Sequence, residues 1–360
     1  MGTHNIQEEI IMDIISRLPV KSLLRFKCVS EFWNTLISEP YFEKKHLKFH
    51  ANNQNSQKLL FGQGINRNFY FLSSSLSPVH IVKDIQRLDS PTQLAIFKIH
   101  CCCDGLFFME IWPGKPYRFL LWNPSTRESI IIPHLEFSDE ELYAYGLGYD
   151  STTDDYKVVK IDINDQVDEI LALKSGSWKR IHETSGRVDY YRRCEGECLA
   201  LVHGAFHWYG YSGGRVVNSL NISSEKYGII PFPETSGLQI SSDDELGVSV
   251  LGGMLCVYFS NEITFNLWAM KTYGVKKSWT NLFTIPTNGQ HPTPMYRFSN
   301  GEVLLNDMKY SGRDVYRISD GSFGLSNRIW PLNSDDDIDG VMTYIGIVYT
   351  ESLINPTLGH

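Results

Sequence analysis

The sequence lacks any segment that resembles a secretory signal or a membrane span. Its first ten residues, MGTHNIQEEI, carry acidic side chains where a signal peptide needs positive charge and then an apolar run. No stretch of the chain reaches the roughly 18 consecutive apolar residues that a transmembrane helix requires. We therefore expect a soluble protein, located in the cytoplasm, the nucleus or both.

A surplus of positive charge is also missing. The 33 lysines and arginines are outnumbered by 41 aspartates and glutamates, which gives a formal net charge of −8. Proteins that bind nucleic acid through its phosphates need a basic footprint, so this class is disfavoured. Cysteines number only 7, and three of them are adjacent at 101–103. An odd, clustered set does not match the paired framework of a secreted domain, and it favours a reducing compartment.

No motif of a common catalytic site occurs. The chain has no Gly-x-Ser-x-Gly elbow, phosphate-binding glycine loop or His-Glu-x-x-His pair. The thiols of Cys101, Cys102 and Cys103 lie in an apolar run, and the sequence identifies no base that could activate them. Because thiols in such runs are usually inert, we expect a protein without catalytic activity of its own.

Two groups of metal-type ligands are present, but their spacing is wrong. The first group is Cys194, Cys198, His203 and His207. Only four residues separate its cysteine pair from its histidine pair, where a zinc finger places about a dozen. We interpret His207 as part of a strand and Cys198 as a small core residue. The aspartates at 335, 337 and 339 begin like a calcium loop, but its twelfth position is Gly346 instead of glutamate. We expect a solvated acidic loop there, and no metal or cofactor.

The sequence does contain many aromatic residues and glycines. Aromatics make up 13% of the 360 residues, and there are 28 glycines. This combination is typical of β-sheet proteins with many tight turns. A chain of this length exceeds one small hydrophobic core, so we expect two domains, or one small module beside a large closed one.

Residues 8–48 show helical periodicity. Apolar residues at 10, 11, 14, 15 and 18 recur on one face of a first helix, which ends at Pro19. A second helix follows, and Ser30 is placed to cap a third helix that Pro40 ends. Three such short helices rarely bury their apolar side chains alone, so they need a partner surface, either the rest of the chain or another protein. A polar stretch at 51–57 separates this module, residues 1–50, from residues 51–360.

From residue 57 onward the pattern is that of short strands in a repeated unit. Each unit opens with a turn and an apolar strand, most clearly in DGLFF at 104–108, HGAFHW at 203–208, GGMLCV at 252–257 and NGEVLL at 300–305. The next strands hold Leu121, Leu173, Leu220, Leu267 and Tyr316. Their spacing of about 48 residues is typical of four-stranded propeller blades.

Residues 57–88 form one further unit, which brings the total to about six blades. A strand at 344–353 could complete this unit, close the ring and remove its open edges. A two-sheet sandwich or an irregular β domain is the alternative fold.

Several stretches of the chain resemble a known family. RLPVKSLLRFKCVSEFW at 17–33 resembles the F-box of the large plant F-box group. Further landmarks resemble that group's F-box-associated (type 1/3) interaction domain: CDGL at 103–106, LWNPSTRE at 121–128, YGLGYDSTTDDYKVVKI at 145–161, SGSWKRI at 175–181, HGAFHW at 203–208, LGGMLCV at 251–257, YGVKKSW at 273–279 and YTESL at 349–353. Plant S-locus F-box proteins share these landmarks. The resemblance implies a mainly β fold, in which a three-helix F-box precedes a kelch-like β-propeller of about six blades.

The resemblance also implies a function. Such a protein is the substrate-recognition subunit of an SCF ubiquitin ligase, and its F-box docks on a Skp-type adaptor and, through it, on cullin and RING subunits. The second domain captures a protein target for ubiquitination and proteasomal degradation, and pollen–pistil self-incompatibility is one pathway within the group. The residues that match the apolar positions of the F-box are Ile10, Ile14, Leu18, Pro19, Val20, Leu23, Val29 and Trp33. We expect Pro19, Val20 and Leu23 to face the adaptor and Trp33 to anchor the third helix.

The chain departs from the family pattern just before its first helix. Most members carry Leu-Pro there, whereas this sequence reads Asn5-Ile6-Gln7. Gln7 cannot replace the rigid proline, so adaptor binding is expected to be weaker than usual. This departure favours an alternative in which the protein is an F-box scaffold or decoy that binds without promoting ubiquitination. A third alternative, a propeller enzyme of the galactose-oxidase type, needs clustered Cys, Tyr and His metal ligands across blades.

Target capture is expected to use the segments that link the blades. These segments are 136–141, 183–197, 234–245 and 288–293. Loops on a rigid β scaffold can vary without disturbing the fold, which suits them to recognition. Their acidic bias favours a basic or neutral target surface.

Overall fold

The protein is represented by a computed structural model. It describes residues 7–51, 53, 56–65, 68–76, 83–91, 96–112, 118–132, 143–162, 167–181, 198–234, 244–286, 292–307, 315–319, 322–325 and 342–357.

The helical module contains four α-helices within the described residues, one more than the sequence pattern predicts. They are α1 (Glu8–Ile15), α2 (Val20–Lys27), α3 (Glu31–Ile37) and α4 (Pro40–His50). Pro40 does not end the last helix of the module but lies in the first turn of α4. Proline suits this position because the first N–H groups of a helix have no partner within it. The expected three-helix module is therefore corrected to four helices.

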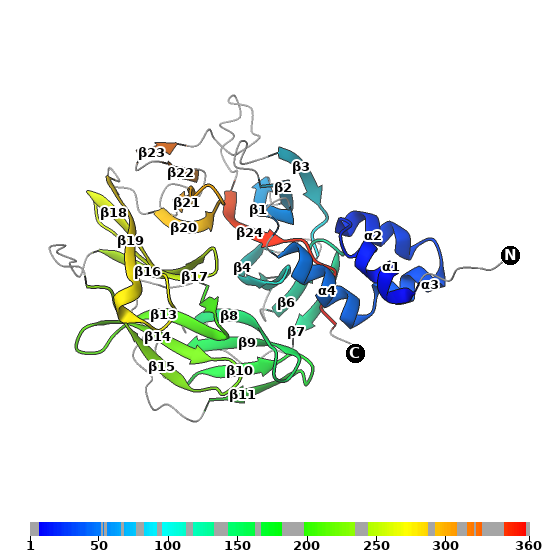
Figure 1. The fold of residues 1–360 in the computed structure, drawn as a ribbon, viewed down its shortest axis with the longest axis horizontal. Helices are drawn as coiled ribbons and strands as arrows, with labels where there is room; N and C mark the ends of the chain where they lie inside the picture. The colour runs from blue at the N-terminus through cyan, green and yellow to red at the C-terminus, as the bar shows by residue number, and fades with distance from the viewer. Residues whose placement is uncertain are drawn as a thin grey trace.

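The strands form six four-stranded sheets arranged as blades around an axis (Figure 1). Blade 1 is β4 (Ile96–Cys103), β5 (Leu106–Trp112), β6 (Arg118–Asn123) and β7 (Glu128–Ile132), and blade 2 is β8 (Tyr143–Asp150), β9 (Asp155–Asp162), β10 (Glu169–Ala172) and β11 (Ser177–Arg180). Blade 3 is β12 (Ala200–Val202), β13 (Ala205–Tyr211), β14 (Arg215–Asn221) and β15 (Tyr227–Pro231), and blade 4 is β16 (Glu245–Leu251), β17 (Met254–Ser260), β18 (Thr264–Met270) and β19 (Trp279–Pro286). Blade 5 is β20 (Pro292–Arg297), β21 (Val303–Asp307), β22 (Val315–Ser319) and β23 (Ser322–Leu325), and blade 6 is β24 (Met342–Thr350), β1 (Gln57–Ile65), β2 (Asn68–Ser75) and β3 (Lys83–Leu88).

A ring of inner strands surrounds the axis. Strand β4 contacts β8, and the sequence of contacts continues through β12, β16 and β20 to β24, which returns to β4. Strand β24 pairs antiparallel with β1, with Gln57 opposite Thr350 and Lys58 opposite Tyr349. The expected closure of the ring by a strand near the end of the sequence is therefore confirmed. The strand ends at Thr350, however, so residues 351–353 lie beyond the sheet.

Tight hairpins connect the first and second strands of several blades. In blade 1, Cys103 pairs with Leu106 across a two-residue loop. Both loop residues, Asp104 and Gly105, have positive φ angles, of 53° and 82°. This is the backbone of a type I′ turn, which matches the right-handed twist of paired strands. The glycine-containing turns expected at 203–204 and 252–253 have the same two-residue form.

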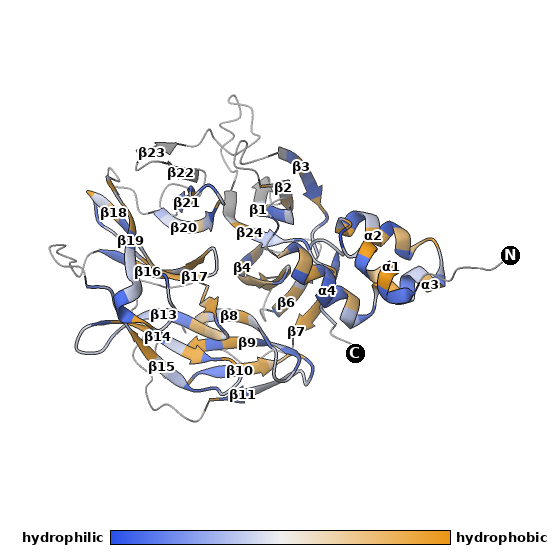
Figure 2. Cartoon of the chain, in the orientation of Figure 1, coloured by the Kyte–Doolittle hydropathy of each residue, from blue (hydrophilic) through white to orange (hydrophobic). Residues whose placement is uncertain are grey.

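Apolar side chains fill the space between neighbouring blades and the interior of the helical module. Figure 2 shows hydrophobic residues along the blade strands and on the helices. The largest cluster joins blades 2, 3 and 4 and contains the fully buried Phe206. The tryptophans Trp122, Trp178, Trp208, Trp268 and Trp279 lie on blade strands, as the repeat pattern predicts. No helix within the described ranges is long and apolar enough to cross a lipid bilayer.

Candidate functional site

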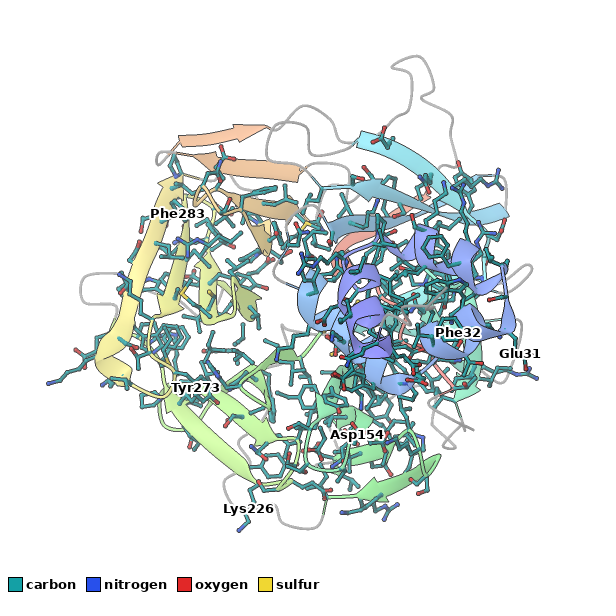
Figure 3. All side chains as sticks on the ribbon, turned by 45° about the vertical axis from the view of Figure 1, so that its right-hand side comes forward. Glu31, Phe32, Asp154, Lys226, Tyr273 and Phe283 are labelled. Carbon is teal, nitrogen blue, oxygen red and sulfur yellow. The ribbon has the colours of Figure 1, made fainter. Side chains whose placement is uncertain are left out.

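The helical module presents large apolar side chains to solvent. The exposed fractions are 48% for Ile10 and 60% for Ile14 on α1, 68% for Val29 after α2, and 49% for Phe32 on α3. Helix α1 is apolar on two sides, because Met12 and Ile15 point into the module while Ile10 and Ile14 point out of it. Large exposed apolar residues on so small a module make it a candidate contact surface. Figure 3 shows Phe32 on the helices in front of the propeller ring.

The structure divides the eight F-box positions into an outer and an inner set. Ile10, Ile14, Pro19 and Val29 are exposed, whereas Leu18 and Trp33 are half-buried. Val20 and Leu23 are 3% and 0% exposed and belong to the core of the module. This burial contradicts the expectation that Val20 and Leu23 face a partner. Apolar residues occur on both the inner and the outer side of the helical module, as on α1, so the sequence alone could not separate the two sets. Phe32, absent from the eight positions, joins the outer set.

Local interactions fix the start of α3. The Ser30 hydroxyl accepts a hydrogen bond from the backbone N–H of Trp33 at 3.4 Å, which confirms the predicted N-cap. The Trp33 ring packs against Phe26 and Phe32, with ring centroids 5.6 and 5.3 Å away. Trp33 thus holds α3 against α2 and orients the exposed Phe32 beside it.

Gln7 occupies the position where the family pattern has proline. It is exposed and precedes α1 with φ −59° and ψ 137°, and its side chain makes no capping hydrogen bond. Proline fixes φ near −65°, so the backbone here already has the shape that proline would impose. Glutamine in place of proline therefore makes the backbone at this position less rigid but leaves its conformation unchanged. Ile6, the other residue of this element, lies outside the described residues.

Helix α4 joins the helical module to blade 2. The Lys44 ammonium forms an ion pair with Asp154, in the turn between β8 and β9, and lies 5.4 Å from the ring centre of Tyr149. Asp154 also accepts hydrogen bonds from the Tyr149 hydroxyl and from Lys174. Hydrogen bonds from these three groups, Lys44 first, hold the pKa of Asp154 well below its usual range. The helices therefore lie against the face of the propeller that carries this turn.

The strand ends that flank the blade-linking segments lie at the opposite face. In an antiparallel four-stranded blade, the turns after the first and third strands lie at one end, and the entry to the blade and the middle turn lie at the other. The contact of α4 with the turn at 151–154 places the helices at the first end. Most residues of the four predicted target-binding segments lie outside the described ranges. The strand ends that flank them, such as Pro231 and Glu245, are at the end away from the helices.

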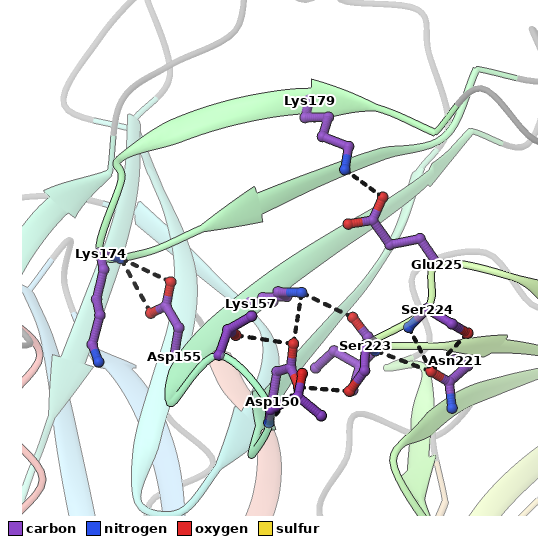
Figure 4. Close-up of polar contacts among 12 residues, drawn as sticks. Asp150, Asp155, Lys157, Lys174, Lys179, Asn221, Ser223, Ser224 and Glu225 are labelled. Atoms are coloured by element: carbon purple, nitrogen blue, oxygen red, sulfur yellow. Dashed lines mark hydrogen bonds and ion pairs between the residues drawn. The ribbon is translucent and has the colours of Figure 1, made fainter.

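The most polar stretch of the family landmarks joins blades 2 and 3 (Figure 4). Asp150, which is fully buried, forms an ion pair of 2.8 Å with Lys157. It also accepts hydrogen bonds from the hydroxyls of Ser223 at 2.5 Å and Thr152 at 2.7 Å. Burial alone would raise the pKa of Asp150, but the bonds from Lys157, Ser223 and Thr152 outweigh burial and keep the pKa far below its usual range. This cluster links blade 2 to blade 3 through contacts that satisfy the buried Asp150 carboxylate.

The metal-type residues have other roles. His207 lies on β13, 3.1 Å from the Ala200 carbonyl and 2.9 Å from the Tyr273 hydroxyl. Burial lowers the pKa of His207 to about 4 and keeps the ring neutral. Cys198 is exposed, which corrects its interpretation as a core residue. Within the described residues no three His, Cys, Asp or Glu side chains gather as metal ligands; Cys194 and the aspartates at 335, 337 and 339 lie outside them.

The adjacent thiols are buried or half-buried and unreactive. Burial raises the pKa of Cys101, Cys102 and Cys103 well above the usual range of a thiol. A thiol must ionise to act as a nucleophile, so these residues are poor candidates for covalent chemistry.

Comparison with known proteins agrees with this architecture. A model of the F-box domain matches residues 4–45, and one of the F-box associated beta propeller domain matches residues 64–313. "F-box protein CPR1" of Arabidopsis thaliana is 29% identical over 331 residues, which cover 82% of this chain and 76% of that protein. "F-box/kelch-repeat protein At3g23880" of the same plant is 28% identical over 335 residues, which cover 89% of this chain and 90% of that protein. The chain therefore belongs to the F-box proteins that carry an F-box associated β-propeller domain.

Proposed function

We propose that this protein is the substrate-recognition subunit of an SCF ubiquitin ligase. Proteins of its family are non-catalytic receptor subunits, and an F-box implies binding to a Skp-type adaptor. The observation that carries the proposal is the apolar outer surface of the helical module, which the propeller does not cover. We assign adaptor binding to residues 1–50 and target capture to residues 51–360. Transfer chemistry then resides in other subunits, and this chain contributes proximity.

The proposed adaptor-binding surface consists of the exposed apolar residues of the helices. Its members are Ile10, Ile14, Pro19, Val29 and Phe32, with the half-buried Leu18 and Trp33 at its margin. Val20 and Leu23 support this surface from beneath instead of contacting the adaptor. Covering several large apolar side chains supplies most of the binding free energy in such interfaces.

Target capture is proposed for the propeller face away from the helices. An adaptor and a target bound at opposite faces do not compete for space. The acidic bias of the blade-linking segments suits a target with a basic or neutral surface. Capture of targets by a variant that cannot bind the adaptor, followed by mass spectrometry, would identify them. A pistil protein among them would support a role in self-incompatibility, and a nuclear or cytoplasmic target would fix the compartment.

Reconstitution with a purified Skp-type adaptor tests the proposal. Replacing Ile14, which is 60% exposed, by aspartate places a charge on the proposed surface, and we expect adaptor binding to fall below detection. Ile229→Asp is the matched control, because Ile229 is 47% exposed on β15 of blade 3. Equal adaptor binding by wild type and Ile14→Asp would refute the proposed surface.

A second function, an F-box scaffold or decoy, is favoured by Gln7. A scaffold or decoy of this kind would bind the adaptor but would not promote ubiquitin transfer. Because the backbone of Gln7 already has φ −59°, Gln7→Pro should fold normally and bind the adaptor more tightly. Ubiquitination of a captured target by the wild-type complex would exclude the decoy. Transfer that appears only with Gln7→Pro would support it.

A further inference from the structure

The residues that follow the closing strand run from the propeller to the helical module. Segment 351–355, named here the clasp, leaves β24 at Thr350. Its first residue, Glu351, donates a backbone hydrogen bond of 3.3 Å to the Ser56 carbonyl, beside the start of β1. The next residue, Ser352, is completely buried. A segment buried between two parts of a protein is expected to have a structural role, which its contacts indicate.

On the propeller side, one asparagine holds the clasp. Asn123, at the end of β6, is 0% exposed, and its amide donates hydrogen bonds to the carbonyls of Ser352 at 3.1 Å and Ile354 at 2.9 Å. The Ser352 hydroxyl donates to the Asp104 carbonyl at 2.6 Å. The contact is so close that a Cβ atom on Gly105 would lie 2.6 Å from the Ser352 oxygen. Blade 1 is therefore shaped to receive this segment.

On the helix side, the clasp completes a core. Leu353 is 1% exposed and packs in the same cluster as Leu23, Leu36 and Phe42. The next residue but one, Asn355, donates its backbone N–H to the Glu43 carboxyl at 3.4 Å. Glu43 is on α4, which also carries the Lys44 contact to blade 2. The helices are thus held at more than one point, which fixes their orientation as well as their position.

The contacts of the clasp alternate between the two parts from one residue to the next. Successive side chains in an extended chain point to opposite sides. Ser352 and Ile354 contact the propeller, and Leu353 between them contacts the helices. Three consecutive residues therefore contact both parts of the molecule.

We propose that the clasp sets the orientation of the adaptor-binding helices relative to the target-binding propeller, and that Asn123, Leu353 and Glu43 are positioning residues for ubiquitin transfer. The proposal rests on the proposed receptor function. A flexible connection would spread the target over a larger volume and lower its effective concentration at the site of transfer. All three residues are buried within this chain, so the role proposed for them is to hold this geometry.

The orientation can be measured on the free protein. Cys28, exposed at the end of α2, carries one spin label, and Lys226→Cys in blade 3 carries the other, in a background with Cys194→Ser and Cys198→Ser. Figure 3 shows Lys226 far from the helices. Pulsed electron paramagnetic resonance should give one narrow distribution of distances between the two labels when the clasp has its wild-type sequence. Asn123→Ala should broaden it without removing any side chain from the helical core.

Ubiquitin transfer provides the second measurement. Asn123→Ala should leave the affinities for adaptor and target unchanged. It should slow ubiquitin transfer to a captured target by about tenfold, because a looser connection lowers the effective concentration of the target at the site of transfer. Leu353→Ala should have a similar effect, and Leu353→Met should restore the rate. Ile263→Ala, at a side chain 73% exposed on the turn between β17 and β18, is the control for a general effect of truncation.

The two measurements separate the inference from the function on which it rests. A broad distance distribution in the wild type, or an unchanged narrow one in Asn123→Ala, overturns the clasp whatever the ligase does. A narrow distribution that broadens in the variant, with an unchanged rate of transfer, overturns the positioning role. Failure of the wild type to bind the adaptor overturns the receptor function and leaves the distance measurement valid.

Discussion

The helical module and the propeller bury their apolar residues in different ways. The propeller closes on itself through β24, and its blades cover one another's faces. The helical module is open on two sides: Leu353 from the clasp fills its inner side, and Ile10, Ile14, Val29 and Phe32 remain uncovered on its outer side. A closed ring needs no partner to be stable, whereas a module of four short helices is built to be completed by others. The propeller is therefore the rigid part of the molecule, and the helical module is the part suited to binding a partner.

The largest effect is expected inside the propeller. Asp150→Asn removes the charge that pairs with Lys157 and leaves a buried ammonium without its counterion. We expect the free energy of unfolding to fall by about 4 kcal/mol, a typical cost of breaking a buried pair. Urea unfolding followed by tryptophan fluorescence measures the loss. Because the pKa of Asp150 is lowered, the pair stabilises the fold above the unfolded pKa of about 4, and this stabilisation is lost as the pH falls towards the folded value. A loss below about 1 kcal/mol would show that the cluster does not lock the blades.

The next effect lies at the junction of the two parts and depends on pH. Burial raises the pKa of Glu43 from 4.5 to about 7, so the folded protein binds an extra proton between these values and its stability falls as the pH rises. Glu43→Gln mimics the neutral form. We expect it to unfold like the wild type near pH 4.5 and to be more stable by up to about 3 kcal/mol at pH 8.

A second buried group at the junction has the opposite slope. Burial lowers the pKa of His46 from 6.5 to about 4, so this residue makes the fold more stable as the pH rises between these values. In the wild type the contributions of Glu43 and His46 partly cancel between pH 4.5 and 6.5. In Glu43→Gln only the increase in stability with pH that His46 causes should remain. Parallel pH profiles of unfolding for the two proteins would contradict the burial of a neutral Glu43.

A smaller effect distinguishes the outer surface of the helices from their core. Phe32→Ala should weaken adaptor binding about tenfold, as expected for an aromatic anchor in an interface. Its effect on the free energy of unfolding should stay within about 0.5 kcal/mol, because the side chain is 49% exposed. Calorimetric titration and thermal unfolding measure the two quantities. Leu23 is 0% exposed, so Leu23→Ala should instead lower mainly the free energy of unfolding. Equal adaptor affinity for Phe32→Ala and wild type would exclude Phe32 from the surface.

The smallest effect tests a single hydrogen bond in blades 3 and 4. Tyr273→Phe removes the hydroxyl 2.9 Å from His207 and leaves a buried ring nitrogen unpaired. We expect a loss of about 1 kcal/mol in the free energy of unfolding and no change in adaptor binding. A change in adaptor binding would mean that the two parts of the molecule are less independent than their cores suggest.

Much of the fold could be predicted from the sequence because it repeats. The spacing of Leu121, Leu220 and Leu267 locates three blades, and these residues all lie on third strands. The inner strands were not part of the predicted unit. Strand β12 shows why, since it has only three residues, Ala200–Val202, and carries too little pattern to be recognised. The closing strand was predicted because an open ring would leave edges exposed.

Less of the candidate site could be predicted, for reasons of geometry. Periodicity shows that α1 is apolar, but it cannot say which side faces the module when Met12 and Ile15 share the helix with Ile10 and Ile14. The same ambiguity placed Val20 and Leu23 on the surface. The bond between Glu43 and Asn355 joins residues 312 positions apart, and no local pattern reports such a contact. The landmark YTESL at 349–353 can be recognised in the sequence, but its contacts with both the propeller and the helices cannot be predicted from it.

Burial of Leu353 among the helices has a consequence for the order in which the protein is made. The helices leave the ribosome before the propeller, and domains generally begin to fold as they emerge. Their core nevertheless lacks one side chain until a segment synthesised long afterwards arrives, and the same segment follows the strand that shuts the ring. A chain broken anywhere between the two would expose both an unfinished helical core and an open blade. The helices are thus completed only by a part of the chain that is made after the propeller, so a chain interrupted before that point is incomplete both in the helical core and in blade 6.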